Sequence, residues 1–196
     1  MILIHNVDVY PISASPIRNG AVAWKDGKIV AIGTVGAEGP EAIAPEVKEA
    51  AGQLKLIDGQ GGVLMPGMID AHCHAGVHEE GIGWEGADYN EATGPVTPDM
   101  RTIDGINPEE RGLKDALQGG VTAVCVVPGS ANVIGGSATV IHTWGSSIVD
   151  QMVIANKVGM KCAFGENPKR VYRNKDKSPA TRMATAAVMR EWLTKA

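Results

Sequence analysis

Residues 66–74 of this 196-residue chain read PGMIDAHCH, which predicts an apolar β-strand that ends in a His-x-His pair. Side chains two positions apart on a strand point to the same side, so His72 and His74 converge while Cys73 points away. Neutral imidazole is a common ligand of zinc and similar divalent ions. The stretch therefore presents two candidate metal ligands, although hydrogen-bonded surface histidines give the same pattern.

The composition is that of a turn-rich globular protein, with 44% hydrophobic and 20% charged residues. The net charge of −4 provides no basic field for a polyanion, so we expect no nucleic-acid partner. The three cysteines are odd in number and widely spaced, which indicates reduced, buried thiols in a cytoplasmic protein. Because no stretch resembles a secretory signal or a membrane span, we expect neither secretion nor membrane insertion.

The first part of the chain, residues 1–60, is predicted to be a small β segment. Two apolar runs, residues 21–25 and 28–32, flank Asp26 and Gly27. Asp-Gly between apolar runs is typical of a tight hairpin, since both central residues of the turn need a positive φ. We place the boundary of this segment near residue 60, where the sequence becomes rich in glycine.

The remainder, residues 61–196, alternates apolar strands with helices. A helix is predicted over residues 107–118, and the β-branched run 121–127 is typical of a strand buried on both faces of a parallel sheet. A strand, a helix and a strand in this order predict a βαβ unit. Two further strands are expected, over residues 138–143 and 160–164. A last helix is expected to begin at Ser178-Pro179. A closed (β/α)8 barrel takes about 250 residues, so about half a barrel is present.

Three motifs occur in a recognisable order: DGKIVAIG at residues 26–33, VLMPGMIDAHCH at 63–74 and GGVTAV at 119–124. Together they resemble the amidohydrolase superfamily, in particular its imidazolonepropionase-like branch. The resemblance implies a composite β-sandwich and a distorted TIM barrel that carries metal at its C-terminal face. We therefore expect an α/β fold. Residues 1–60 would form the N-terminal β segment of the sandwich, and residues 61–196 the N-terminal half of the barrel.

A third candidate ligand, Glu166, follows the apolar run 160–164, and functional side chains of a barrel lie at the carboxyl ends of its strands. The resemblance implies a glutamate ligand in the deacetylase-like members and a carboxylated lysine in others. Glu166 matches the former. Lys161 lies at the start of the run and on the opposite parity, so we expect it to face helices or solvent. The alternative for Glu166 is a helix cap or an ion pair with Lys169 or Arg170.

Two imidazoles and one carboxylate, from His72, His74 and Glu166, are the ligand set of a catalytic zinc site; iron or manganese are alternatives, with one or two ions. Such an ion activates water and polarises a carbonyl, which favours hydrolysis of an amide C–N bond. The resemblance also implies two later histidines and a catalytic aspartate beyond this chain. We therefore expect an incomplete cytoplasmic hydrolase that is inactive until the C-terminal half of the barrel, or a second chain supplying it, is present.

Residues 75–106 form a long acidic segment that follows the first barrel strand. Such a segment can act as a lid or specificity loop, or as a solvated loop or subunit contact. Within it, Trp84 and Arg101 are candidate substrate contacts, and Trp84 and Tyr89 would stack on the substrate. His142 is a third candidate, from a neighbouring strand. For Trp84 and Tyr89 the alternative is anchoring of the loop, and for His142 it is a structural role.

Three functions remain open at this point. The first is a metal-dependent hydrolase of a small-molecule amide, cyclic or linear. The second is a dihydroorotase- or allantoinase-like cyclic amidohydrolase, against which a glutamate in place of a strand-end lysine counts. The third is a non-catalytic metal-binding or assembly subunit that pairs through the open edge of the half-barrel. Because such an edge exposes unpaired backbone groups, we expect an oligomer.

Overall fold

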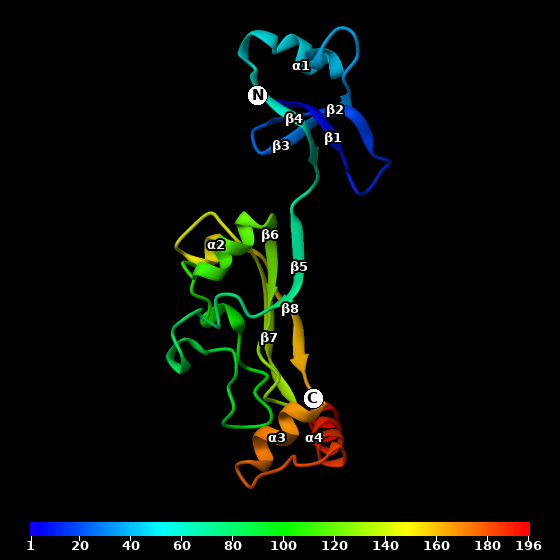
Figure 1. The fold of residues 1–196 in the computed structure, drawn as a ribbon. Coiled ribbons are helices and arrows are strands. Elements are labelled where there is room, and N and C mark those ends of the chain that lie inside the picture. The colour runs from blue at the N-terminus through cyan, green and yellow to red at the C-terminus, as the bar shows by residue number, and fades with distance from the viewer. The chain divides into compact units, whose positions relative to one another are not determined.

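The computed structural model describes residues 1–196, except for the side chain of Ala51, and the chain divides into two compact units, Met1–Pro66 and Gly67–Ala196. Figure 1 shows a separate sheet in each unit. The fold is therefore mixed α/β, as predicted at the level of class. None of the described helices is long and apolar enough to cross a membrane.

Unit 1 is built on a four-stranded sheet in the order β3-β2-β1-β4, in which β1 and β4 are parallel and the other pairs antiparallel. Its elements are β1 (Ile2–Val9), β2 (Ile17–Lys25), β3 (Lys28–Thr34), η1 (Pro40–Ile43), α1 (Pro45–Glu49), η2 (Ala51–Gln53) and β4 (Lys55–Leu64). Asp26 and Gly27 join β2 to β3 with φ of 52° and 75°, which confirms the predicted hairpin. Strand β4 continues past residue 60, so the expected boundary falls inside it.

Unit 2 is built on a four-stranded sheet in the order β5-β6-β7-β8. Its elements are β5 (Met68–Cys73), η3 (Trp84–Gly86), η4 (Thr102–Asp104), α2 (Arg111–Gln118), β6 (Val121–Val126), β7 (Ile134–His142), η5 (Val149–Gln151), β8 (Val153–Cys162), α3 (Glu166–Arg173) and α4 (Arg182–Lys195). Strands β5 and β6 are parallel, and β7 is antiparallel to both β6 and β8. Strands β5, β6 and β8 therefore run in one direction and β7 in the other.

The predicted βαβ unit is present as β5, α2 and β6, but the rest of the sheet differs from a regular barrel. A TIM barrel contains parallel strands only, whereas β7 runs against its neighbours. The expected strand over residues 160–164 is also shifted, because pairing with β7 starts β8 at Val153 and the strand ends at Cys162. The half-barrel assignment stays a prediction.

Helix boundaries also differ from the sequence expectation. The helix expected over residues 107–118 begins at Arg111, because the side chain of Asn107 accepts a hydrogen bond from the backbone N–H of Glu109 at 3.0 Å and forms a turn there. The last helix begins at Arg182, because Thr181 is its N-cap and accepts from the Ala184 N–H at 3.1 Å.

The three cysteines are free thiols. Cys73 and Cys125 are half-buried and Cys162 is exposed, so the expectation that all three are buried is wrong for Cys162. Burial raises the pKa of Cys73 to about 11, which keeps this thiol protonated at neutral pH.

The core of unit 2 includes residues from the 75–106 segment. Val77 and Ile106 pack with Leu113 of α2 and with buried residues of β6 and β7. The buried hydroxyl of Thr102 donates to the Ser137 carbonyl of β7 at 2.9 Å. The segment is therefore fixed to the sheet at several points rather than free in solvent.

The 75–106 segment packs closely against Gly136 of β7. A Cβ at Gly136 would lie 2.4 Å from the backbone oxygen of Met100, whereas a Cβ at Gly159 of β8 meets no described atom within 4 Å. Because a backbone oxygen cannot swing away, we expect Gly136→Ala to destabilise unit 2 by about 1–3 kcal/mol and Gly159→Ala to have little effect. Urea unfolding of the two variants measures the difference, and equal midpoints would contradict the packing described.

Candidate metal centre

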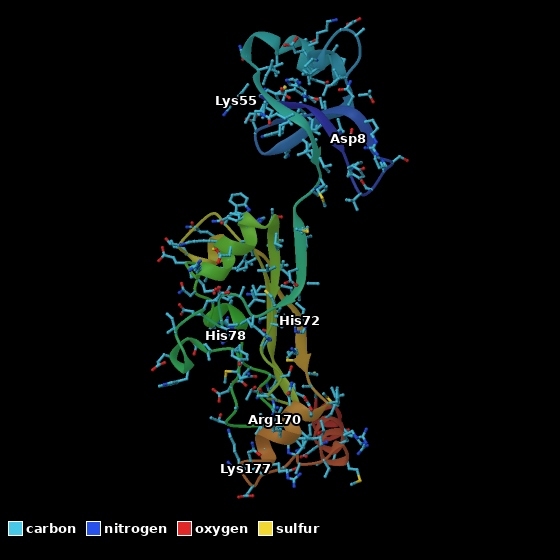
Figure 2. The ribbon with its side chains drawn as sticks, in the orientation of Figure 1. Asp8, Lys55, His72, His78, Arg170 and Lys177 are labelled. Carbon is cyan, nitrogen blue, oxygen red and sulfur yellow. The ribbon has the colours of Figure 1, made fainter. Side chains whose placement is uncertain are left out.

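His72 and His74 lie at the carboxyl end of β5, one inside the strand and one directly after it. Their ring centroids are 5.9 Å apart in an edge-to-face arrangement. His72 is exposed and His74 is half-buried. Figure 2 shows His72 beside the end of β5. The two imidazoles are therefore near neighbours at the strand end.

A backbone carbonyl fixes the ring of His74. Nδ1 of His74 lies 2.8 Å from the carbonyl oxygen of Val127, in the loop that follows β6. A carbonyl only accepts, so Nδ1 carries the proton and donates it, and Nε2 is left with its lone pair free. Burial lowers the pKa of His74, which favours the neutral ring. A neutral imidazole oriented through its other nitrogen is the usual state of a histidine metal ligand.

Lys161 also belongs to this site, contrary to the sequence expectation. Its Nζ lies 3.2 Å from Nε2 of His72 and donates to the carbonyl oxygen of Pro128 at 3.2 Å. The expectation that Lys161 faces helices or solvent is wrong, because β8 ends at Cys162 and Lys161 therefore lies at the carboxyl end of its strand. Burial lowers the pKa of this amine.

The contact between His72 and Lys161 joins β5 and β8, which are the two edge strands of this sheet. Both residues lie near the carboxyl ends of their strands. The candidate site therefore extends across the carboxyl edge of the sheet.

Glu166 is not brought to the histidines by any described contact. It is the exposed first residue of α3, and among the described residues no group of three or more His, Cys, Asp or Glu side chains is arranged to hold a metal ion. The alternative ion pair with Lys169 or Arg170 is also absent from the described ion pairs. Its role as third ligand stays a prediction.

The three candidate substrate contacts lie in different places. Trp84 is 83% exposed in η3. Arg101 donates from Nε and Nη2 to both carboxylate oxygens of Asp104, at 2.8 and 2.6 Å. His142 pairs with Ala123 near the start of β6, which places it at the other end of the sheet from His72, and its ring packs on Trp144 at 5.3 Å.

Two residues, Tyr89 and Glu110, support the site in ways that the sequence does not predict. The ring of Tyr89 lies between two imidazoles, with centroids 5.2 Å from His74 and 4.8 Å from His78. The buried carboxylate of Glu110 accepts a hydrogen bond from the Gly76 N–H at 3.0 Å, at a turn where Gly76 has a φ of +83°. Neither contact follows from local spacing, because each joins residues that are distant in the sequence.

Comparisons with known proteins give matches in sequence and in structure. No protein-family model matches the chain. It is 37% identical over 139 residues to Amidohydrolase tasK of Hapsidospora irregularis (65% of this chain, 14% of the relative) and 34% identical over 58 residues to an imidazolonepropionase of Geobacillus sp. (strain WCH70) (30% and 12%). The crystal structure of an amidohydrolase from Thermotoga maritima MSB8 superposes with a TM-score of 0.85 at 42% identity, over 100% of this chain and 47% of that one.

The chain is thus a mixed α/β protein, and these relatives are amidohydrolases and an imidazolonepropionase. The chain is related to the amidohydrolase superfamily, which confirms the predicted resemblance. It spans less than half the length of each of these relatives.

Proposed function

We propose that this chain is part of a metal-dependent amidohydrolase whose whole protein hydrolyses a C–N amide bond of a small molecule, cyclic or linear, in the cytoplasm. The observation that carries the proposal is the ring of His74, which Val127 holds with Nε2 free beside His72. A fixed neutral imidazole next to a second imidazole at a strand end is suited to hold a divalent cation. Zinc is the first expectation, with iron or manganese as alternatives and one or two ions.

The residues of this chain would bind and orient, and the bound cation would activate water and polarise the amide carbonyl. His72 and His74 would hold the cation through their imidazole nitrogens. The Val127 carbonyl would keep the tautomer of His74, and Tyr89 would keep its ring plane. The resemblance implies a catalytic aspartate in the remainder of a longer protein, and without that residue we expect the chain alone to be inactive.

For the third ligand we favour Lys161 over Glu166. Lys161 already contacts His72, whereas Glu166 has no such contact. A lysine amine becomes an anionic ligand when its neutral Nζ attacks CO2, forming an N–C bond and losing one proton. Other members of the superfamily that the sequence resembles use a carboxylated lysine, which supports this step. The objection to a dihydroorotase- or allantoinase-like enzyme was the absence of a strand-end lysine. A carboxylated Lys161 would remove this objection, so such an enzyme is the second candidate function.

Two substitutions separate the candidate third ligands. We expect Lys161→Met to lose zinc and Glu166→Gln to retain it, when each 196-residue variant is purified with zinc and bicarbonate and its metal content is measured. Mass spectrometry under native conditions should show one CO2 adduct in the unmodified chain and none in Lys161→Met. Zinc loss in Glu166→Gln alone would instead assign the carboxylate as the ligand.

The remainder of the protein is proposed to complete both units. On unit 1, Ile29 and Val63 are 66% and 63% exposed, and on unit 2 Ile69 is 70% exposed. Large exposed apolar side chains on both units are consistent with coverage by further protein. We propose that later strands complete a composite β-sandwich with unit 1 and a distorted TIM barrel with unit 2, from the same chain or from a second one.

A chimera tests the proposed activity. This chain would replace the corresponding segment of the Thermotoga maritima amidohydrolase, to which it is 42% identical over its whole length. We expect the chimera to hydrolyse at least one amide in a panel of cyclic ureides, N-acyl amino acids and dipeptides, and to lose this activity with His72→Ala. A folded, metal-loaded chimera that turns over none of them, while the unmodified Thermotoga protein does, would favour the non-catalytic subunit.

A further inference from the structure

The loop that joins β6 to β7, residues 127–133, contacts two side chains of the candidate metal centre through consecutive carbonyl groups. The Val127 carbonyl accepts from Nδ1 of His74 at 2.8 Å, and the Pro128 carbonyl accepts from Nζ of Lys161 at 3.2 Å. One dipeptide therefore contacts the residue that follows β5 and a residue near the end of β8. The directions of its two carbonyls determine how both side chains are held.

The carbonyl of Val127 cannot be fixed through its own peptide group. The next residue is Pro128, which has no N–H, so the peptide between them has no donor. Its direction depends on the peptide groups on either side. The N–H of Val127 donates to the Cys73 carbonyl at 3.0 Å, and the N–H of Gly129 donates to the Tyr89 carbonyl at 2.5 Å. The second of these hydrogen bonds joins the loop to the long segment that follows β5.

Asn90 adds a side-chain contact to the same loop. Its Oδ1 accepts from the Ala131 N–H at 3.0 Å. The Asn90 side chain also lies against Gly129, where a Cβ would be 2.2 Å from Oδ1. A side chain at position 129 would therefore displace Asn90 and break its bond to Ala131. The close fit of Asn90 and Gly129 fixes the loop directly after the two carbonyls.

A second asparagine, Asn132, holds the backbone next to Asn90. Asn132 is 3% exposed, and its Nδ2 donates to the carbonyl oxygens of Glu91 and Gly94, at 2.6 and 2.8 Å. The carbonyl of Gly94 also accepts from the hydroxyl of Tyr172, a fully buried residue of α3. The backbone beside Asn90 is therefore fixed both to the loop and to α3, so Asn90 has a defined position from which to hold the loop.

The tautomer of His74 depends on this arrangement. While the Val127 carbonyl accepts from Nδ1, Nε2 stays free; without that acceptor a neutral imidazole exchanges between its two tautomers. We propose that Asn90 is a positioning residue of the candidate metal centre, which acts through the loop 127–133 and keeps His74 in the tautomer with Nε2 free. Gly129 is required because it admits Asn90. The link to metal binding rests on the proposed function, whereas the effect on the tautomer does not.

NMR of the imidazole nitrogens in the full 196-residue chain, without metal, measures the tautomer of His74. The measurement is made at about pH 8, where an ordinary imidazole is neutral. We expect a proton on Nδ1 alone in the unmodified chain and a mixture of both tautomers in Asn90→Ala. Asn90→Asp keeps an oxygen that accepts from the Ala131 N–H, so this variant should retain the single tautomer. The rescue separates loss of the acceptor from a general loss of packing.

Two glycine substitutions test the same contact from the side of the loop. Gly129→Ala places a Cβ against Asn90 and should also give a mixture of tautomers. Gly94→Ala is the matched control, because a Cβ there meets no described atom within 4 Å, and it should retain the single tautomer. Since the added Cβ acts by displacing Asn90, Gly129→Ala should have little further effect when Asn90→Ala is already present.

Zinc titration of the same variants tests the link to the metal centre. Loss of a residue that orients a metal ligand commonly costs about 10–100-fold in metal affinity. We expect a loss of this size in Asn90→Ala and Gly129→Ala, and unchanged affinity in Asn90→Asp and Gly94→Ala.

A single tautomer retained in both Asn90→Ala and Gly129→Ala would overturn the positioning role of Asn90. A changed tautomer with unchanged zinc affinity would overturn its assignment to the metal centre. If the unmodified chain binds no zinc, the proposed function fails, and the tautomers measured without metal still decide whether Asn90 positions His74.

Discussion

The substitution His74→Ala is expected to abolish zinc retention and to leave the fold largely intact. His74 is the imidazole whose tautomer the Val127 carbonyl fixes, so its loss removes the better oriented of the two proposed ligands. Loss of a supporting residue alone commonly costs about 10–100-fold in metal affinity, so loss of the ligand should exceed about a hundredfold. The folding cost is one neutral hydrogen bond, about 1 kcal/mol. Zinc content after dialysis and a urea unfolding curve measure the two effects.

His78→Ala is the matched control for this prediction. His78 is an exposed imidazole whose ring centroid lies 4.8 Å from that of Tyr89. It is not a proposed ligand. We expect this variant to retain zinc, and His72→Ala to lose it. Zinc retained at the original level in His74→Ala would remove the strand-end pair from the metal site.

The features that could be predicted from the sequence are those that local chemistry decides. Asp26 and Gly27 form the expected hairpin because the turn needs two positive φ values. His72 and His74 end a strand because an apolar run precedes them and their spacing matches the period of a strand. The superfamily relationship followed from several such local motifs in a fixed order.

The features that could not be predicted depend on pairing between distant segments. The ends of β8 are set by its pairing with β7, where Cys162 lies opposite Ile134. A shift of two residues in the predicted strand end was enough to assign Lys161 to the wrong side of the site. The direction of β7 likewise depends on its partners. An apolar run in the sequence does not indicate whether the strand pairs in a parallel or an antiparallel manner.

Glu110 shows a related limit. The sequence predicts that Glu110 closes a capping box at Asn107, but in the structure α2 begins after Glu110 and this capping box is not formed. In the structure its buried carboxylate precedes α2 and holds the Gly76 turn that directly follows the strand-end histidines. Helix α2 thus connects the core of unit 2 to the candidate metal centre, and its packing affects both.

Leu113→Ala in α2 is expected to destabilise unit 2 by about 2–5 kcal/mol, the usual cost of a leucine removed from a closely packed core. Leu113 is fully buried and packs with Val124 and Val126 of β6. Leu117 lies on the same helix but is 38% exposed, so Leu117→Ala should cost below about 1 kcal/mol. Urea unfolding and hydrogen exchange of the β6 amides measure both variants.

Equal losses of stability would contradict the packing of α2 that is described here. Because α2 begins directly after Glu110, loosening of the helix should also expose the Gly76 amide, whose hydrogen exchange should accelerate in Leu113→Ala and not in Leu117→Ala. Zinc binds only the folded site, so saturating zinc should recover part of the stability that Leu113→Ala loses. The recovery should vanish when His74→Ala is added. The free energy of unfolding with and without zinc would then show that the core of unit 2 and the proposed metal centre are energetically coupled.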